Sequence, residues 1–305
     1  MGKSIGVIAI HGIGEQTAEF DSDFRDALGS ELGSDVREDV KFESIYYQEL
    51  IQAEQRKIWE QMKAVGIKGS LPRRRLWGFL RKGLLFSFSD ATTYLHNSDA
   101  ASSSYRQVHD EIVRSIHSLQ LKLEDDTAPV VIVAHSLGAY VISNYIWDAQ
   151  HCSGIWSDDR KPSDIERFGN VANLSTIGCN IPLFVSGLKK VEAFHEPNEG
   201  FEWLNYYDKD DILGWPLKPL SKGFTNSYKK VVTRDIRVNV GGWLKSWNPF
   251  SHSTYWTDGG FIKPLAREIE RIHANVQRPG GTAVYASAVA CHKAHEEDGT
   301  PVYED

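Results

Sequence analysis

The chain has 305 residues, of which 41% are hydrophobic and 25% are charged, so it can bury a sizeable core as one large domain or two smaller ones. Its net charge of −7 excludes the basic profile of a typical nucleic-acid-binding protein, and three cysteines are too few and too irregularly spaced for a disulfide framework or a zinc site. No charged-then-apolar signal segment opens the chain and no apolar run reaches about 18 residues, so we expect a cytoplasmic protein without a membrane span.

Apolar runs and amphipathic stripes alternate along the chain, and each predicts a strand or a helix. In chain order, we expect a strand at 5–10, a helix at 20–32, a strand at 42–47, a helix at 105–123, a strand from 130, a helix at 137–147, strands at 174–179, 203–207 and 231–240, and a helix at 261–272. This alternation predicts an α/β fold, with a mostly parallel central sheet covered by helices on both faces. We expect one domain over 1–277, followed by a loosely held C-terminal tail at 278–305.

The most informative segment, residues 130–139, reads Val-Val-Ile-Val-Ala-His-Ser-Leu-Gly-Ala. Four β-branched residues predict a buried strand, which breaks into a small-x-Ser-x-Gly turn before a helix begins. This context is typical of a nucleophile elbow, a sharp strand-to-helix turn that raises one hydroxyl, here that of Ser136, above the end of a sheet. The alternative interpretation of Ser136 is an ordinary helix N-cap.

A nucleophilic serine needs a base to take its proton and an acid to orient that base. In folds with such an elbow, the acid and then the histidine follow the serine along the chain, each at the carboxyl end of a strand. His252, in a loop after the last predicted strand, is the candidate base, whereas His195 comes too early to keep this order. The candidate acids after the 203–207 strand are Asp208, Asp210 and Asp211, and their spacing alone does not choose among them.

The backbone amides expected to hold a developing oxyanion belong to Leu137, directly after the serine, and to Ile13, in the loop after the first strand. Gly12 and Gly14 allow the backbone of that loop to approach a substrate, and we expect them to line the substrate site together with His135. The loop lacks the third glycine of a dinucleotide-binding motif. No cluster of histidine, cysteine and carboxylate residues has metal-ligand spacing, so we expect no metal and no organic cofactor.

Three motifs together resemble the α/β-hydrolase superfamily, and in particular its lipase-like members, the class 3 lipases and the DDHD-type phospholipases. The motifs are His-Gly-Ile-Gly-Glu at 11–15, Ala-His-Ser-Leu-Gly at 134–138, and Asp-Ile-Leu-Gly-Trp-Pro-Leu at 211–217 with Ser-His-Ser-Thr-Tyr-Trp at 251–256. In those relatives the catalytic acid opens a turn of the Asp-(Ile/Pro)-Val type, so the resemblance implies Asp211. Two departures are Ala134 in place of the first elbow glycine, and Leu213 with Gly214 in place of the usual turn residues.

We therefore expect a serine esterase or lipase-like hydrolase that forms an acyl-enzyme on Ser136, with a small-molecule or lipid ester as substrate. The alternative is a non-catalytic binding or interaction protein with the same fold, because fold alone does not determine function. The oligomeric state is not predicted.

The 53–104 insertion interleaves basic and apolar residues at helical spacing over 73–86. Its basic residues are Arg73, Arg74, Arg75, Arg81 and Lys82, and its apolar residues are Leu76, Trp77, Phe79, Leu80, Leu84, Leu85 and Phe86. One hypothesis is a lid over Ser136 that also contacts a membrane surface, as interfacial helices do. The alternative is that these aromatic residues pack a helix pair onto the core.

Overall fold

The computed structural model describes residues 3–12, 16–51, 57, 60, 61, 94, 103–157, 162–187, 191–221, 227–240 and 249–287. Over these ranges one six-stranded sheet forms, with the strand order β2-β1-β3-β4-β5-β6 and with every neighbouring pair parallel. The strands are β1 (Ile5–Ile10), β2 (Val40–Ile45), β3 (Val130–His135), β4 (Val171–Ile177), β5 (Glu202–Asp208) and β6 (Val232–Val238). The predicted α/β class with a mostly parallel sheet is confirmed.

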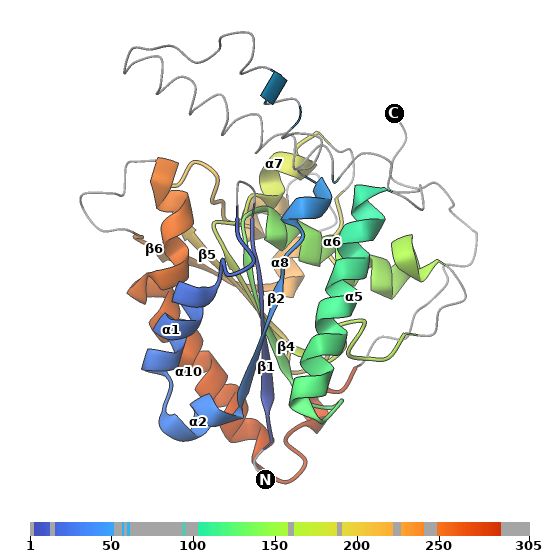
Figure 1. Cartoon of the computed structure of the whole chain (residues 1–305), viewed down its shortest axis with the longest axis vertical. Helices are drawn as coiled ribbons and strands as arrows, with labels where there is room; N and C mark the ends of the chain where they lie inside the picture. Colours follow the sequence, from blue (N-terminus) through green and yellow to red (C-terminus); the bar gives the residue numbers. More distant parts are fainter. Residues whose placement is uncertain are drawn as a thin grey trace.

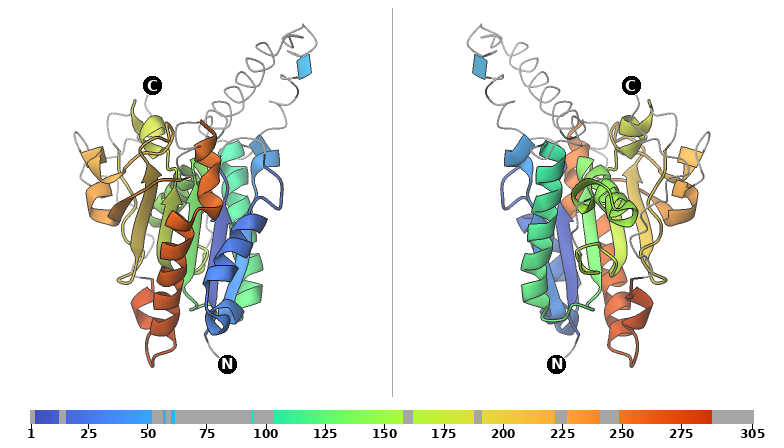
Figure 2. Two further views of the ribbon diagram at one scale, coloured as in Figure 1. Left: turned by 90° about the vertical axis from the view of Figure 1, so that its left-hand side faces the viewer. Right: turned by 90° about the vertical axis from the view of Figure 1, so that its right-hand side faces the viewer.

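Helices cover both faces of the sheet (Figures 1 and 2). One layer contains α1 (Ser22–Glu31) and α10 (Gly259–Val276), and the other contains α5 (Ser104–Leu123) and α6 (Leu137–His151). The shorter elements are α2 (Ser34–Asp39), η1 (Gly154–Trp156), α7 (Ile181–Val185), η2 (Lys218–Ser221), α8 (Ser227–Val231), η3 (Pro249–Thr257) and η4 (Ala283–Tyr285). Strands buried on both faces read as continuous apolar runs, which is why β1 and β3 are conspicuous in the sequence.

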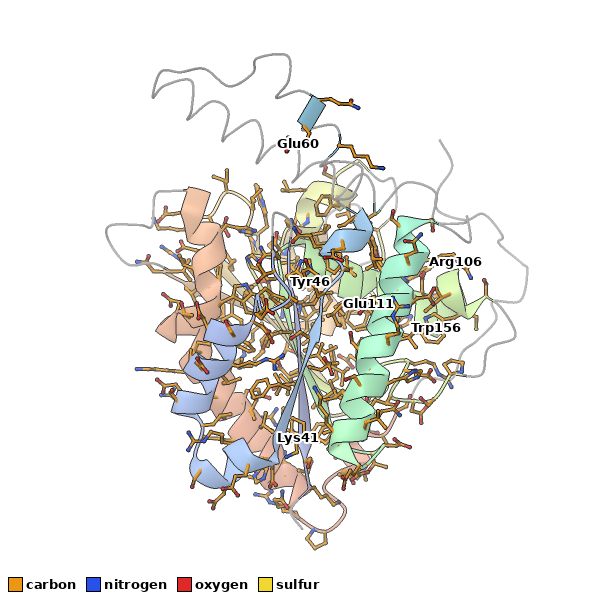
Figure 3. All side chains as sticks on the ribbon, viewed as in Figure 1. Lys41, Tyr46, Glu60, Arg106, Glu111 and Trp156 are labelled. Carbon is orange, nitrogen blue, oxygen red and sulfur yellow. The ribbon has the colours of Figure 1, made fainter. Side chains whose placement is uncertain are left out.

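All the strands end at the edge of the sheet that is uppermost in Figure 1. In Figure 3, Lys41 in β2 lies near the lower end of the sheet and Tyr46, just after β2, lies higher, which gives the direction of this strand. Because the sheet is parallel, the loops after β1, β3, β4 and β5 meet at the same edge. Ser136 and Asp211 belong to these loops.

Two glycines allow the end of β1 to lie directly against the start of α6. A Cβ atom on Gly138 would lie 2.5 Å from the carbonyl oxygen of His11, and one on Gly12 would lie 2.5 Å from the Cβ of Ser136. Real Cβ atoms do not approach other heavy atoms so closely, so only glycine fits at either position. The contact fixes Ser136 against the loop that follows β1.

Several boundaries differ from the sequence predictions. β4 ends at Ile177, two residues earlier than predicted, and α6 continues to His151. The described start of the expected tail, up to residue 287, packs on the domain, because the ring of Tyr285 is buried and Gly200 donates a 2.9 Å hydrogen bond to Val284. A single buried tyrosine in an Ala- and Gly-rich segment gives no periodic signal, so sequence patterning does not predict this contact. Cys152 is disulfide-bonded and Cys179 is free.

Most of the 53–104 insertion, including 73–86, lies outside the described residues, so the lid and its membrane contact stay predictions. Tyr94, a described residue of this segment, is buried and its hydroxyl lies 2.9 Å from Nε2 of His109 in α5. Among the described helices, none is both long enough and apolar enough to cross a membrane. The cytoplasmic location stays a prediction.

The close contact at Gly138 makes a stability prediction. Gly138→Ala should lower the free energy of unfolding by about 1–3 kcal/mol, because the new methyl group would meet the carbonyl oxygens of His11 and Ile10. The matched control is Gly29→Ala in α1, where the added Cβ would meet only the Arg37 side chain at 3.8 Å. That substitution should raise stability by about 0.5–1 kcal/mol, since alanine is the better helix former. Urea unfolding of both variants measures the contrast, and equal effects would contradict it.

Candidate active site

Ser136 lies directly between the end of β3 and the start of α6, in a strained backbone conformation. Its φ of 53° and ψ of −121° are rare for a residue with a side chain. The backbone amide of Ser136 donates a 3.0 Å hydrogen bond to the carbonyl of Ile177 at the end of β4. The Ser136 side chain makes no capping bond to α6, so the N-cap interpretation does not account for it. A strained serine between the end of a parallel strand and the start of a helix is the geometry that the predicted elbow requires.

His252, in η3, pairs with Asp211. Nδ1 of the imidazole lies 2.8 Å from Oδ2 of the carboxylate, and both side chains are largely buried. Since a carboxylate accepts hydrogen bonds, Nδ1 carries the hydrogen and Nε2 is left as an acceptor. Nε2 is buried and has no hydrogen-bond partner among the described residues. This pairing leaves Nε2 as an unpartnered acceptor among the described residues.

The imidazole of His252 packs on the turn that follows β4. A Cβ atom on Gly178, whose φ is +55°, would lie 3.0 Å from both Cε1 and Nδ1 of His252. β4 is the neighbour of β3 in the sheet, and the backbone of Ser136 is bonded to its last residue. The turn at Gly178 therefore brings the His252 ring to the side of the sheet edge where Ser136 lies.

The three candidate acids have different partners. The carboxylate of Asp208 accepts hydrogen bonds from the backbone amides of Asp210, at 2.9 Å, and Val240, at 2.7 Å. The carboxylate of Asp210 lies 3.2 Å from the ammonium of Lys209. Of the three, Asp211 is the one that contacts His252. Its role as the catalytic acid stays a prediction.

The Asp211 carboxylate is held in its ionised form. Burial raises its pKa, but the hydrogen bond to His252 and further bonds from the Leu213 amide, at 2.9 Å, and the Tyr255 hydroxyl, at 3.0 Å, outweigh burial and lower the pKa below its ordinary value. Burial raises the pKa of Tyr255, so its hydroxyl stays neutral and donates. An ionised carboxylate at this point stabilises a positive charge on His252 when the imidazole takes up a proton.

His135 supports His252 through its main chain. Nε2 of His135 lies 2.7 Å from the carbonyl oxygen of His252, and the two rings are 4.7 Å apart between centroids. Burial lowers the pKa of His135 to about 3, so its ring is neutral and donates this hydrogen bond through Nε2. We expected His135 to line the substrate site. The side chain is buried, with Nε2 bonded to the His252 carbonyl and Nδ1 beside Gly12, and the substrate-lining role stays a prediction.

His11 fixes the loop after β1 in a similar way. Its ring stacks on Tyr47 at 4.2 Å between centroids, Nδ1 lies 2.8 Å from the carbonyl of Gly12, and Nε2 accepts from the Tyr47 amide. Burial lowers the pKa of His11 to about 4, which keeps the ring neutral at neutral pH. Gly12, predicted to line the substrate site, is therefore held directly against Ser136.

The predicted oxyanion amides are described only in part. Leu137 is the first residue of α6, so its amide has no acceptor within the helix, as a donor to an oxyanion requires. Ile13 and Gly14 lie outside the described residues. Their roles stay predictions.

Asn180, which the sequence did not predict to be at the site, donates a 3.0 Å hydrogen bond from Nδ2 to Oγ of Ser136. The available signal was positional, because this polar residue follows a buried strand that neighbours the elbow strand. Tyr255 was also missed, although it lies in the Ser-His-Ser-Thr-Tyr-Trp motif, because only the fold brings its hydroxyl to Asp211.

A scan of protein-family models gives no match to this chain, and a search of the curated proteins gives none either. Within the described part of the chain, no group of three or more histidine, cysteine or carboxylate side chains could hold a metal ion.

The low pKa of His135 predicts a pH effect on stability. The unfolded chain binds a proton here near pH 6.5, whereas the folded protein does so only near pH 3. The stability from this group is therefore fully present above pH 6.5 and is lost as the pH falls toward 3, by up to about 1.4 kcal/mol per pH unit. His135→Gln should make the loss of unfolding free energy between pH 7 and pH 5 smaller by about 2 kcal/mol. Urea unfolding of the variant and the wild type at both pH values tests this, and an unchanged difference in the variant would contradict it.

Proposed function

We propose that this chain is a serine hydrolase of the α/β-hydrolase type that cleaves a carboxylic ester through an acyl-enzyme on Ser136. The observation that carries the proposal is the buried pair of Asp211 and His252. Nε2 of His252 has no partner among the described residues. The His252 ring packs on the turn at Gly178, next to the strand end that bonds the backbone of Ser136. The serine, the aspartate and the histidine follow one another along the chain in the order that such hydrolases have. They come after the ends of β3, β5 and β6, respectively.

In the proposed reaction, Oγ of Ser136 attacks the ester carbonyl carbon while its proton moves to Nε2 of His252. The carbonyl π electrons move to oxygen, and the Leu137 amide donates to the resulting oxyanion. Collapse of this intermediate releases the alcohol, which takes the proton from His252, and leaves the acyl group on Ser136. Water then attacks the acyl-enzyme with His252 again as base, and Asp211 stabilises the imidazolium in both halves.

The surface near the site favours a substrate with an apolar acyl group. Of the five large hydrophobic side chains exposed in the described residues, Leu183 is 43%, Ile212 69% and Trp215 43% exposed. Ile212 follows Asp211, Leu183 lies in α7 after Asn180, and the Trp215 amide bonds to Cys179 at 2.9 Å. We call these three residues the apolar rim. Exposed apolar groups concentrated beside a polar site are typical of a ligand-binding surface.

A non-catalytic binding protein is the alternative function. It would keep the apolar rim but would not need the Asp211 carboxylate held ionised against His252. Covalent labelling of the serine separates the two functions directly.

An alkyl fluorophosphonate should label Ser136, and Ser136→Ala should abolish labelling. Ser136→Ala and His252→Ala should each lower the hydrolysis rate of a p-nitrophenyl ester on the order of 10⁴- to 10⁶-fold, because a serine hydroxyl without its base is a poor nucleophile. Peptide mapping of the labelled protein and steady-state rates provide the measurements.

The matched pair Asp211→Asn and Asp210→Asn tests the acid. Asp211→Asn should lower kcat by several orders of magnitude, since the amide favours the wrong tautomer of His252. Asp210→Asn should leave the rate nearly unchanged, because Asp210 contacts Lys209 and not His252. The reverse ranking would assign the role of catalytic acid to Asp210 instead of Asp211. A wild-type chain that takes no label would favour the alternative function, a non-catalytic binding protein.

The apolar rim predicts a dependence on acyl chain length. Ile212→Ala and Trp215→Ala should lower kcat/KM about tenfold for a long-chain p-nitrophenyl ester and little for the acetate, because only the long chain reaches apolar surface worth about 0.8 kcal/mol per methylene. Leu121→Ala is the control, since Leu121 is 83% exposed near the end of α5, at the opposite edge of the sheet (Figure 1). Equal losses for both esters would argue against an acyl-binding rim.

A further inference from the structure

Asn180 occupies a position where an asparagine side chain ordinarily caps a helix by accepting a hydrogen bond from a backbone amide. It is the N-cap residue of α7, and asparagine is among the best N-cap residues because its oxygen accepts from the first turn of a helix. Asn180 makes no such bond to α7. Its amide points instead to Ser136, with Nδ2 3.0 Å from Oγ.

The bond to Ser136 is the one hydrogen bond of this side chain among the described residues. Asn180 is fully buried, and its Oδ1 has no partner in that part of the chain. The backbone on either side is fixed, since Cys179 accepts from the Trp215 amide at 2.9 Å and Asn180 accepts from the Leu183 amide at 3.0 Å. A buried amide with one unsatisfied atom costs stability. What sets Asn180 apart from the other such amides among the described residues is that its donor bonds to Oγ of Ser136.

We propose that Asn180 is a catalytic residue that stabilises the negative charge developing on and beside Oγ of Ser136 during acyl transfer; this rests on the proposed function. A hydroxyl oxygen has one hydrogen and two lone pairs. The Asn180 amide occupies one lone pair, which leaves the other for attack and the hydrogen for Nε2 of His252.

During attack the Oγ–carbon bond forms, the Oγ proton passes to His252, and the carbonyl π electrons become the lone pair of the oxyanion. The amide of Asn180 remains beside these atoms and donates its hydrogen bond to the oxygen on which negative charge develops. It is already oriented in the resting protein, so it needs no rearrangement when charge develops. Together with the Leu137 amide it supplies a donor from the β4 side of the site.

The test is the rate at which an alkyl fluorophosphonate labels Ser136. In this reaction Oγ bonds to phosphorus, fluoride leaves with the electron pair of the phosphorus–fluorine bond, and the Oγ proton passes to His252. Asn180→Ala should slow labelling on the order of 10²-fold and lower kcat for an ester by a similar factor with little change in KM, as expected for one lost donor.

Asn180→Asp gives a second readout that a merely structural role would not produce. It has nearly the same shape, but its carboxylate cannot donate and places a negative charge beside Oγ. It should therefore label more slowly than Asn180→Ala although it preserves the side-chain volume. This variant also keeps the test decisive if Asn180→Ala fails to fold.

Asn170→Ala is the matched control. Asn170 is also buried, donates one hydrogen bond, to the carbonyl of Ala128 at 2.6 Å, and has an unpartnered Oδ1, but it lies at the amino end of β4. It should lower the unfolding temperature and leave the labelling rate at the wild-type value.

The outcomes separate the two proposals. If wild-type Ser136 is labelled and folded Asn180→Asp or Asn180→Ala is labelled within twofold of the wild-type rate, the role of Asn180 is overturned and the hydrolase proposal stands. If the wild-type chain takes no label at Ser136, the proposed function fails and the role of Asn180 fails with it.

Discussion

The contact between the end of β1 and the start of α6 is the constraint on which the candidate site depends. Gly12 and Gly138 remove the two Cβ atoms that would otherwise separate these backbones, so Ser136 is held between the loop after β1 and the end of β4. A serine at positive φ is unfavourable in isolation by about 1–3 kcal/mol, and only packing from several sides keeps it there. The buried, neutral rings of His11 and His135 hold the neighbouring loops, because they bond to the carbonyls of Gly12 and His252.

A second set of contacts is a chain of hydrogen bonds that links the end of β5 to the imidazole of His252. Asp208 fixes the turn by accepting from two backbone amides, and its own amide donates to the Tyr255 hydroxyl at 2.8 Å. That hydroxyl in turn donates to Asp211, which holds His252. The aspartate cluster is thus divided between support of the turn and contact with the histidine. The described hydrogen bonds of this network hold the carboxylate of Asp211 and Nδ1 of His252 in one geometry, and Nε2 of His252 is left without a partner among the described residues.

The fold was largely predictable from the sequence because its signals are local. β1 and β3 are unbroken apolar runs, α5 carries a regular apolar stripe, and strands that alternate with helices leave few topologies to consider. The candidate serine was predictable for the same reason, since strand, turn and helix are contiguous. The contacts of Asn180 with Ser136 and of Tyr255 with Asp211 could not be predicted from the sequence. Each joins residues more than 40 positions apart, and nothing in the local pattern encodes them. The buried position of Tyr285 was missed for the same reason.

Several local rules are broken at the same edge of the sheet. Ser136 adopts a conformation rare for a non-glycine residue, Asn180 leaves its helix uncapped, and Nε2 of His252 is buried without a partner among the described residues. None of these is diagnostic alone, because Asn170 and Asn173 also carry unpartnered buried atoms in the described part of the chain, and Phe168 also has positive φ. What distinguishes the carboxyl ends of these strands is that all three departures involve either Oγ of Ser136 or Nε2 of His252. Each departure costs on the order of 1 kcal/mol or more, and sequences retain such costs together where a reaction or a ligand requires the strained arrangement.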